Sequence, residues 1–142
     1  MEINELIDIP QFTVIEAEKL NNEIFLAGEL KNTDKHCPHC GKEVLKPHQY
    51  KPRVVRHTPI VDKPTYLKFK ESSFLCPICN KSFTEKVEFV DLYQHSTKDY
   101  QRHVYELAKK QDFCRVAEME GIDPGTVSSF FKTGSKLLKT KN

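Results

Sequence analysis

Four of the five cysteines in this 142-residue chain form two pairs with two residues between the members of each pair. The pairs are Cys37 with Cys40, in the sequence CPHC, and Cys76 with Cys79, in the sequence CPIC. Two cysteines at this spacing on a tight turn present both thiolates to one ion, and zinc prefers four such ligands in a tetrahedron. The sequence therefore predicts one structural zinc ion held by all four, with no vacant position for catalysis.

Other roles for cysteine and histidine are less consistent with the pattern. Thiol–disulfide exchange at a CxxC pair needs a βαβ context and a helix N-terminus after the first cysteine, and the sequence supplies neither. We expect Cys114 to be a small buried residue of a helix. Four histidines near the cysteine pairs are interpreted as surface or phosphate-contacting residues: His36, His39, His48 and His57.

Short strands are the elements that must position the cysteines. Between residues 35 and 90, prolines recur at positions 38, 47, 52, 59, 64 and 77, which excludes a long helix. The β-rich runs at 54–58, 65–70 and 73–75 predict a small antiparallel sheet. Within 65–70, Leu67 and Phe69 share one face of the strand.

A hairpin is expected ahead of the ribbon. The runs 12–17 and 24–30 are β-rich, and residues 20–22 supply the turn between them. No catalytic group is present in this hairpin, and we expect it to cover an apolar face of the ribbon.

Three helices are expected after residue 95, each from its capping residues. Ser96 and Asp99 are spaced like a capping box, and this first helix should end near Lys110. The second should begin after Asp112 and stop at Gly121. The third should begin with Asp123 as N-cap and Pro124 at the first helical position, and should end before Gly134.

The last two helices have the features of a helix-turn-helix. Ala117 is the small residue where the helices cross, and Gly121 can take the positive φ that the turn requires. Glu120 stands where an apolar residue is usual, and Met119 is expected to take over its packing. The inward packing positions are Val116, Ile122, Val127 and Phe130.

The outer face of the third helix is the candidate base-reading surface. Its backbone can approach DNA closely at a glycine, and its polar side chains can donate hydrogen bonds to base edges or phosphates. The residues expected to contact DNA there are Gly125, Thr126, Ser128, Ser129 and Lys132. The alternative is a helical bundle that binds a protein partner.

Charge is distributed unevenly along the chain, although its net value is only +2. Residues 35–70 hold nine lysines and arginines against Glu43 and Asp62. A local excess of this size attracts a polyanion, although a solvated lysine-rich surface has the same composition. The residues expected to contact phosphates are Arg53, Arg56, Lys68 and Lys70.

Two classes of protein are not expected. The first ten residues have no basic start and no apolar run, so they do not resemble a secretory signal. No segment has the roughly 20 apolar residues of a membrane span. A bacterial cytoplasmic protein, associated with the nucleoid, is the expectation.

Three segments together resemble the zinc-finger region of the ISL-three family of insertion-sequence transposases. They are CPHCG at 37–41, the basic stretch at 51–70, and FLCPICNKSFTE at 74–85. The opening hairpin and the helix-turn-helix follow the same order as in that family. The resemblance implies binding of double-stranded DNA at the terminal inverted repeats of a mobile element. It also implies that strand transfer belongs to a following acidic domain, which we do not find in this sequence.

The sequence thus predicts an α+β chain that binds DNA, has structural zinc and is not an enzyme. We expect a β hairpin at 1–34, a zinc ribbon at 35–90 and a helix-turn-helix domain at 91–142. A transcriptional regulator or transposition repressor is the closest alternative, and a zinc-ribbon adaptor for proteins is another. The sequence leaves open a homodimer and a protein partner.

Overall fold

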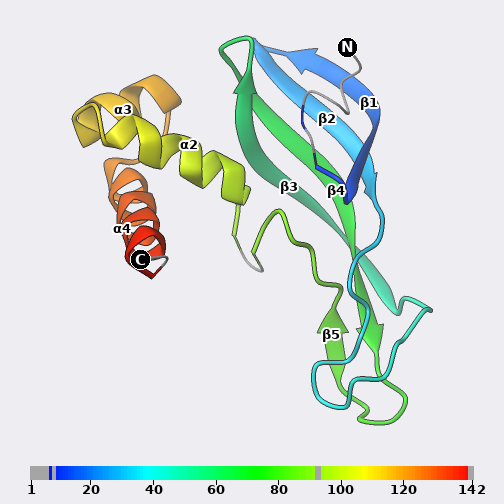
Figure 1. Ribbon diagram of the computed structural model, residues 1–142. Coiled ribbons are helices and arrows are strands. Elements are labelled where there is room, and N and C mark those ends of the chain that lie inside the picture. Colours follow the sequence, from blue (N-terminus) through cyan, green and yellow to red (C-terminus); the bar gives the residue numbers. More distant parts are fainter. Residues whose placement is uncertain (1–6, 8, 92–93, 141–142) are drawn as a thin grey trace.

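Among the described residues, a sheet is followed by three helices (Figure 1). A computed structural model describes residues 7, 9–91 and 94–140, with side chains as far as Lys136. The strands are β1 (Phe12–Leu20), β2 (Glu23–Leu30), β3 (Gln49–Ile60), β4 (Lys63–Leu75) and β5 (Ser82–Thr84). The helices are α2 (Lys98–Ala108), α3 (Phe113–Glu120) and α4 (Pro124–Thr140). The α+β prediction is therefore confirmed.

The sheet is mixed, which corrects the prediction of a purely antiparallel ribbon. Its order is β1-β2-β4-β3, with β5 paired to β4, and β2 runs parallel to β4. Each of the two parallel strands is followed in the chain by one of the cysteine pairs. Since both pairs must meet at one end of the sheet, β2 and β4 must run in the same direction.

Two tight turns close the hairpins of this sheet. Asn21 and Asn22 join β1 to β2, and Val61 and Asp62 join β3 to β4, all four with positive φ. Turns of this kind match the right-handed twist of paired strands. The predicted runs 65–70 and 73–75 belong to one continuous strand, β4. β3 tolerates its prolines because it lies at the end of the strand order.

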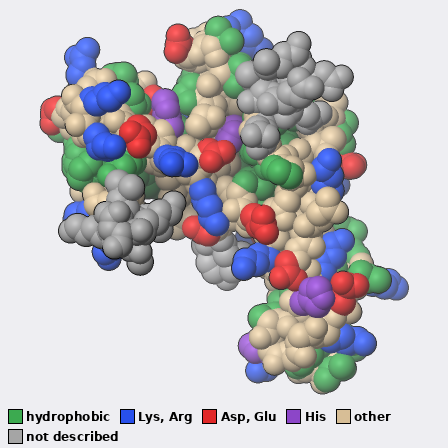
Figure 2. All heavy atoms as spheres, in the orientation of Figure 1, with side chains coloured by type: hydrophobic (Ala, Val, Ile, Leu, Met, Phe, Trp, Pro, Cys, Tyr) green, Lys and Arg blue, Asp and Glu red, His purple; other side chains and the backbone are tan. Residues whose placement is uncertain are grey.

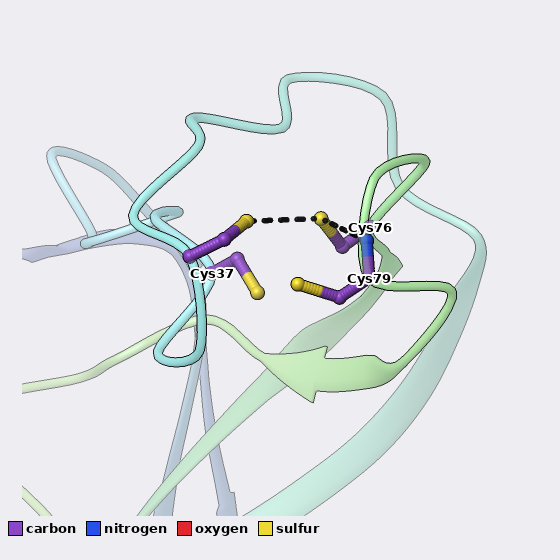
Figure 3. A group of neighbouring side chains, drawn as sticks. Cys37, Cys76 and Cys79 are labelled. Atoms are coloured by element: carbon purple, nitrogen blue, oxygen red, sulfur yellow. Dashed lines mark hydrogen bonds between the residues drawn. The ribbon is translucent and has the colours of Figure 1, made fainter.

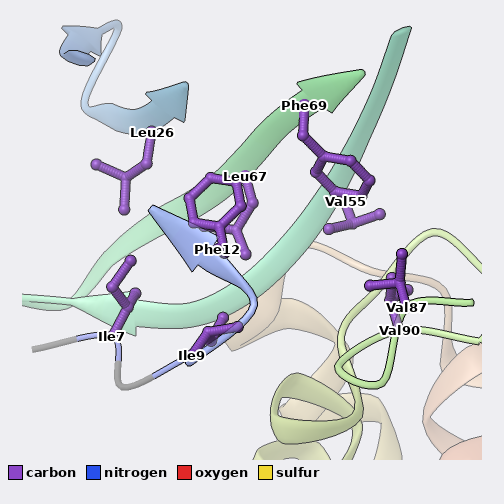
Figure 4. Close-up of a cluster of buried hydrophobic side chains, with 9 residues drawn as sticks. All are labelled: Ile7, Ile9, Phe12, Leu26, Val55, Leu67, Phe69, Val87 and Val90. Carbon is purple, nitrogen blue, oxygen red and sulfur yellow. The ribbon is translucent and has the colours of Figure 1, made fainter. Parts of the chain in front are cut away.

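The main core lies against one face of the sheet (Figure 4). Phe12 and Leu67 are both members of this core, and the Phe12 ring meets Phe69 and Phe89 edge to face, each at 6.1 Å between centroids. The segment after β5 supplies Val87 and Val90 to the same cluster. The predicted hairpin therefore contributes to the core of the ribbon sheet.

The three helices pack around a second core, separate from the first. Its buried members are Tyr100, Val104, Ala108, Val116, Ala117 and Val127. Gly121 ends α3 with φ 67°, and Asp112 is the residue before that helix, as predicted. None of the helices among the described residues is long and apolar enough to cross a membrane.

Two helix boundaries differ from the prediction. The N-cap of α2 is Thr97, whose hydroxyl accepts a hydrogen bond from the Tyr100 N–H at 3.1 Å, because Ser96 is instead bridged to β3. α4 continues through Gly134, where an added Cβ would lie 2.5 Å from the Tyr105 ring. The glycine at position 134 therefore allows α4 to pack closely against α2 and does not end the helix as the sequence had suggested.

The helices are joined to β3 by backbone and side-chain hydrogen bonds. The Arg56 N–H donates to the His95 carbonyl at 2.9 Å, and the Thr97 N–H donates to the Arg56 carbonyl at 2.9 Å. Residues 95–97 therefore extend the sheet edge for a short distance before α2 begins. In Figure 1 the helices lie beside one part of β3, and the cysteine loops lie at the opposite end of the β3–β4 hairpin.

Candidate metal centre and nucleic-acid interface

The two cysteine loops have the same backbone hydrogen bonds. In the first, the Cys37 N–H donates to the Lys42 carbonyl at 2.8 Å and the Gly41 N–H donates to the Cys37 carbonyl at 2.8 Å. In the second, the Cys76 N–H donates to the Lys81 carbonyl and the Asn80 N–H donates to the Cys76 carbonyl, at 3.0 and 2.8 Å. Gly41 and Asn80 both have positive φ, which closes each loop tightly.

The four sulfur atoms converge between these loops (Figure 3). All lie within 4.8 Å of one another, and the Sγ atoms of Cys40 and Cys76 are 3.5 Å apart. Tetrahedral zinc with Zn–S bonds of about 2.3 Å requires sulfurs separated by about 3.8 Å. The donor set and its spacing therefore fit zinc.

The protonation of the thiols is consistent with a bound cation. The backbone N–H of Cys79 lowers the pKa of the Cys76 thiol to about 7. A hydrogen bond with the Cys40 thiol raises the pKa of Cys79 to about 12. Crowded sulfurs cannot all ionise without a compensating positive charge, which zinc supplies.

A small apolar cluster surrounds the metal centre. Phe74 of β4 stacks on Phe83 of β5 with 5.5 Å between ring centroids, and Val44 packs beside them. Cys37 and Cys76 are buried in the same cluster. The metal centre is thus part of the packing at this end of the sheet.

Paired cysteine loops on a short sheet define a zinc-ribbon protein. Residues 34–79, which include all four ligands, match the family model of the zinc-finger of transposase IS204/IS1001/IS1096/IS1165. The predicted resemblance to ISL-three transposases is therefore confirmed for this segment, which is a transposase-type zinc ribbon with structural zinc. No curated protein and no solved structure shows a significant match to the chain.

Arg53 is engaged within the protein, although it was predicted to contact phosphates. Its guanidinium forms a 2.6 Å ion pair with Glu71. It also donates to the backbone carbonyls of Asp91 and Gln94, at 2.8 and 2.5 Å. These contacts fasten the segment after β5 to the sheet.

Arg56 is engaged in a similar way on the other face of β3. Its guanidinium carbon lies 4.7 Å from the centroid of the Tyr100 ring, and its Nη2 lies 3.5 Å from Glu120 Oε1. Among the described residues, Arg56 Nε has no hydrogen-bond partner. The guanidinium groups of both arginines are therefore engaged in contacts within the protein.

Lys68 and Lys70 lie differently, because their side chains are exposed. They alternate along β4 with the buried Leu67 and Phe69, as the pattern predicted. The Lys68 ammonium lies 5.8 Å from the Phe25 ring centroid. On the face drawn in Figure 2, lysines and arginines are interspersed with acidic side chains.

The predicted DNA-contacting residues of α4 lie on its outer side and on its flanks. Gly125, Ser129 and Lys132 are exposed, and Thr126 and Ser128 are half-buried. Val127, between them, is fully buried against the other helices. Gly125, Ser129 and Lys132 thus lie on the outer side of one helix, with Thr126 and Ser128 on its flanks.

Three predictions about other side chains were wrong. His57 is 2% exposed and lies against Thr97, so it is not a surface residue. Cys114 is exposed, because α3 buries Val116 and Ala117 instead. His36, His39 and His48 are exposed, as expected.

The third wrong prediction concerns the turn between α3 and α4. Met119 is 52% exposed and does not replace an apolar side chain at Glu120. The Glu120 carboxylate accepts a hydrogen bond from the Tyr100 hydroxyl at 2.9 Å and lies 3.6 Å from His103 Nε2. A hydrogen bond with His103 is the main cause that holds the pKa of Glu120 below its usual value. The unusual glutamate was the one sequence signal for this cluster.

Proposed function

We propose that this chain is a sequence-specific DNA-binding module of an insertion-sequence transposase, which recognises terminal inverted repeats and does not itself cut DNA. The observation that carries the proposal is a transposase-type zinc ribbon followed by a helix whose exposed side is polar. Structural zinc bound by thiolates suits a bacterial cytoplasm, where the nucleoid is the target.

We assign the reading of sequence to α4 of a helix-turn-helix. Its order of helix, left-handed glycine and helix is the one that this motif uses. Ser129 and Lys132 are well placed for base edges, because the opposite side of the helix packs through Val127. Thr126 and Ser128 lie on its flanks, where phosphate contacts are expected.

We assign affinity to the exposed lysines of β4, with a revised role for the arginines. Lys68 and Lys70 have exposed side chains that can contact phosphates, so we assign the electrostatic contribution to them. Arg53 and Arg56 support binding indirectly, since their guanidinium groups maintain the structure. This differs from the sequence-based expectation that all four contact DNA.

The test begins with selection of bound duplexes from a random pool, followed by titrations at several salt concentrations. Lys68→Ala should weaken binding to selected and scrambled duplexes equally and lower the salt slope by about 0.9. Ser129→Ala with Lys132→Ala should erode the preference for the selected duplex, by about 1–3 kcal/mol for each interaction with a base that is removed.

Lys110→Ala, an exposed lysine just after α2, serves as the matched control, and we expect no change in preference. The assignment of sequence reading to α4 is wrong if the α4 variant keeps its full preference for the selected duplex while the β4 variant loses that preference. A zinc-loaded protein that binds no DNA at low salt would refute the proposed function and favour a protein-binding adaptor. DNA cleavage with magnesium that disappears on one carboxylate substitution would refute the non-catalytic role.

A further inference from the structure

Glu120 is an uncommon residue for its position, and its surroundings explain it. It is the last residue of α3 and directly precedes the glycine of the turn into α4. Its side chain is 9% exposed and is held by groups from two other elements, which are Arg56 of β3 and Tyr100 and His103 of α2. One carboxylate therefore joins three segments of the chain.

Arg56 completes the same cluster from the sheet. It lies opposite Tyr66 in the β3–β4 register, with its guanidinium carbon 6.0 Å from that ring and 4.7 Å from the Tyr100 ring. The cation is thus held between an aromatic ring of the sheet and one of the helices, with Glu120 as its counter-ion. Its side chain is 12% exposed, so water screens this contact much less than a surface ion pair.

The sheet face that carries Arg56 is the one that carries the exposed lysines. Strand alternation places Arg56 on the same side of β3 as Val54, which pairs with Lys68 across the ladder. The contact with Glu120 therefore brings the start of α4 to the lysine-bearing side of the sheet.

We propose that Arg56, Tyr100 and Glu120 form a latch that fixes α4 relative to the sheet, so that the lysine surface and the outer side of α4 bind one duplex as a rigid unit. Arg56 and Glu120 are positioning residues that do not contact DNA. Holding two binding surfaces at the correct separation raises the affinity for the combined site without any new contact. The DNA part of this inference rests on the proposed function, and the orientation part does not.

The test uses the zinc-loaded full chain with Glu120→Gln, which has the same shape and keeps a hydrogen-bond acceptor for Tyr100 but removes the charge. Arg56→Met and the double variant complete a cycle. Lys109→Gln is the matched control, because it removes an exposed ion pair with Glu106 on the same helical unit. Residual dipolar couplings measure the orientation and order of the α4 amides relative to β4. Duplex titrations measure affinity for selected and random DNA.

We expect the wild type and Lys109→Gln to have one fixed orientation. The latch variants should show reduced order of the helices relative to the sheet. They should lose about tenfold or more in affinity for the selected duplex, with random DNA unaffected. The double variant should lose less than the sum of the two single variants, since both remove the contact between Arg56 and Glu120.

Unchanged dipolar couplings in Glu120→Gln and Arg56→Met would overturn the latch, whether or not the protein binds DNA. If the wild type selects no DNA sequence, the proposed function fails while the couplings still decide the latch. If Arg56→Met does not fold, the isosteric Glu120→Gln still removes the ion pair, and Arg56→Lys keeps the charge but loses the planar guanidinium beside the two rings. Full selected-site affinity in Glu120→Gln would also overturn the proposal.

Discussion

The Thr97 hydroxyl lies 2.8 Å from His57 Nδ1 and joins the N-cap of α2 to strand β3. The same hydroxyl accepts from the Tyr100 N–H, and its own proton can be donated to His57 when the ring is neutral with Nδ1 unprotonated. The His57 ring is buried, which disfavours its charged form. The connection between helices and sheet thus includes a buried histidine whose protonation is penalised.

Stability should therefore fall below neutral pH. Burial lowers the pKa of His57 from 6.5, so the unfolded chain binds the proton more readily than the folded one. The contribution is complete above the unfolded pKa and is lost as the pH falls through the folded value, at most by about 1.4 kcal/mol per pH unit. Urea unfolding of the zinc-loaded protein between about pH 7.5 and 5.5 measures this slope.

His57→Asn supplies a neutral acceptor near the place of Nδ1, so its stability should depend less on pH than that of the wild type. His48→Asn changes an exposed histidine and should retain the wild-type slope. Equal slopes in all three proteins would show that His57 does not control this transition.

Zinc removal should unfold one end of the sheet and spare the rest. The cluster that contains Cys37, Phe74 and Phe83 depends on the metal, whereas the larger core around Phe12 and Leu67 contains no cysteine. A chelator should therefore abolish amide-exchange protection at the cysteine loops and leave β2 and β4 protected at their parallel contact.

Cys76→Ser should reproduce the effect of the chelator, and Cys114→Ser, at an exposed cysteine outside the site, should not. Metal analysis should give one zinc per chain for the wild type. Loss of protection along the whole sheet after chelation would show that the core around Phe12 and Leu67 also depends on the metal centre.

Gly134→Ala should destabilise the helices even though alanine favours helix formation. The added Cβ would lie 2.5 Å from the ring of the buried Tyr105, and overpacking of this kind costs about 1–3 kcal/mol. Gly125→Ala is the matched control on the same helix, because its Cβ would meet only the end of the Asp123 side chain, at 2.9 Å. Thermal unfolding should rank Gly134→Ala below the wild type and Gly125→Ala close to it. The reverse order would show that the contact relaxes easily.

Arg53→Ala should act on stability more than on phosphate binding. The substitution leaves the half-buried Glu71 without a partner and removes two hydrogen bonds to backbone carbonyls, at a cost of about 2–4 kcal/mol. Denaturant titration measures the loss, and Lys70→Ala, an exposed residue of the neighbouring strand, should cost little. If Arg53→Ala has the wild-type denaturation midpoint but a lower salt slope of DNA binding, Arg53 contacts a phosphate as the sequence predicted.

Much of the metal centre and of the local structure could be predicted from the sequence, because the determinants are close together in the chain. Two residues between cysteines define a loop whose hydrogen bonds are internal, and the 34–79 match confirms its type. The positive φ of Gly121 and the alternation of Leu67 with Lys68 follow from the same short-range rules.

Contacts between distant segments were decided only by the tertiary structure. The parallel pairing of β2 with β4 follows from the need to bring both cysteine loops to one ion, which no local pattern encodes. The sequence could count basic residues, but only the fold shows that Arg56 faces Glu120 while Lys68 faces solvent. A charge is free or engaged according to the partner that folding brings to it, and those partners come from other elements. The amino-acid sequence by itself thus determined the zinc ligands and the helix turn, and the packing of helices on the sheet decided which charged groups remain available.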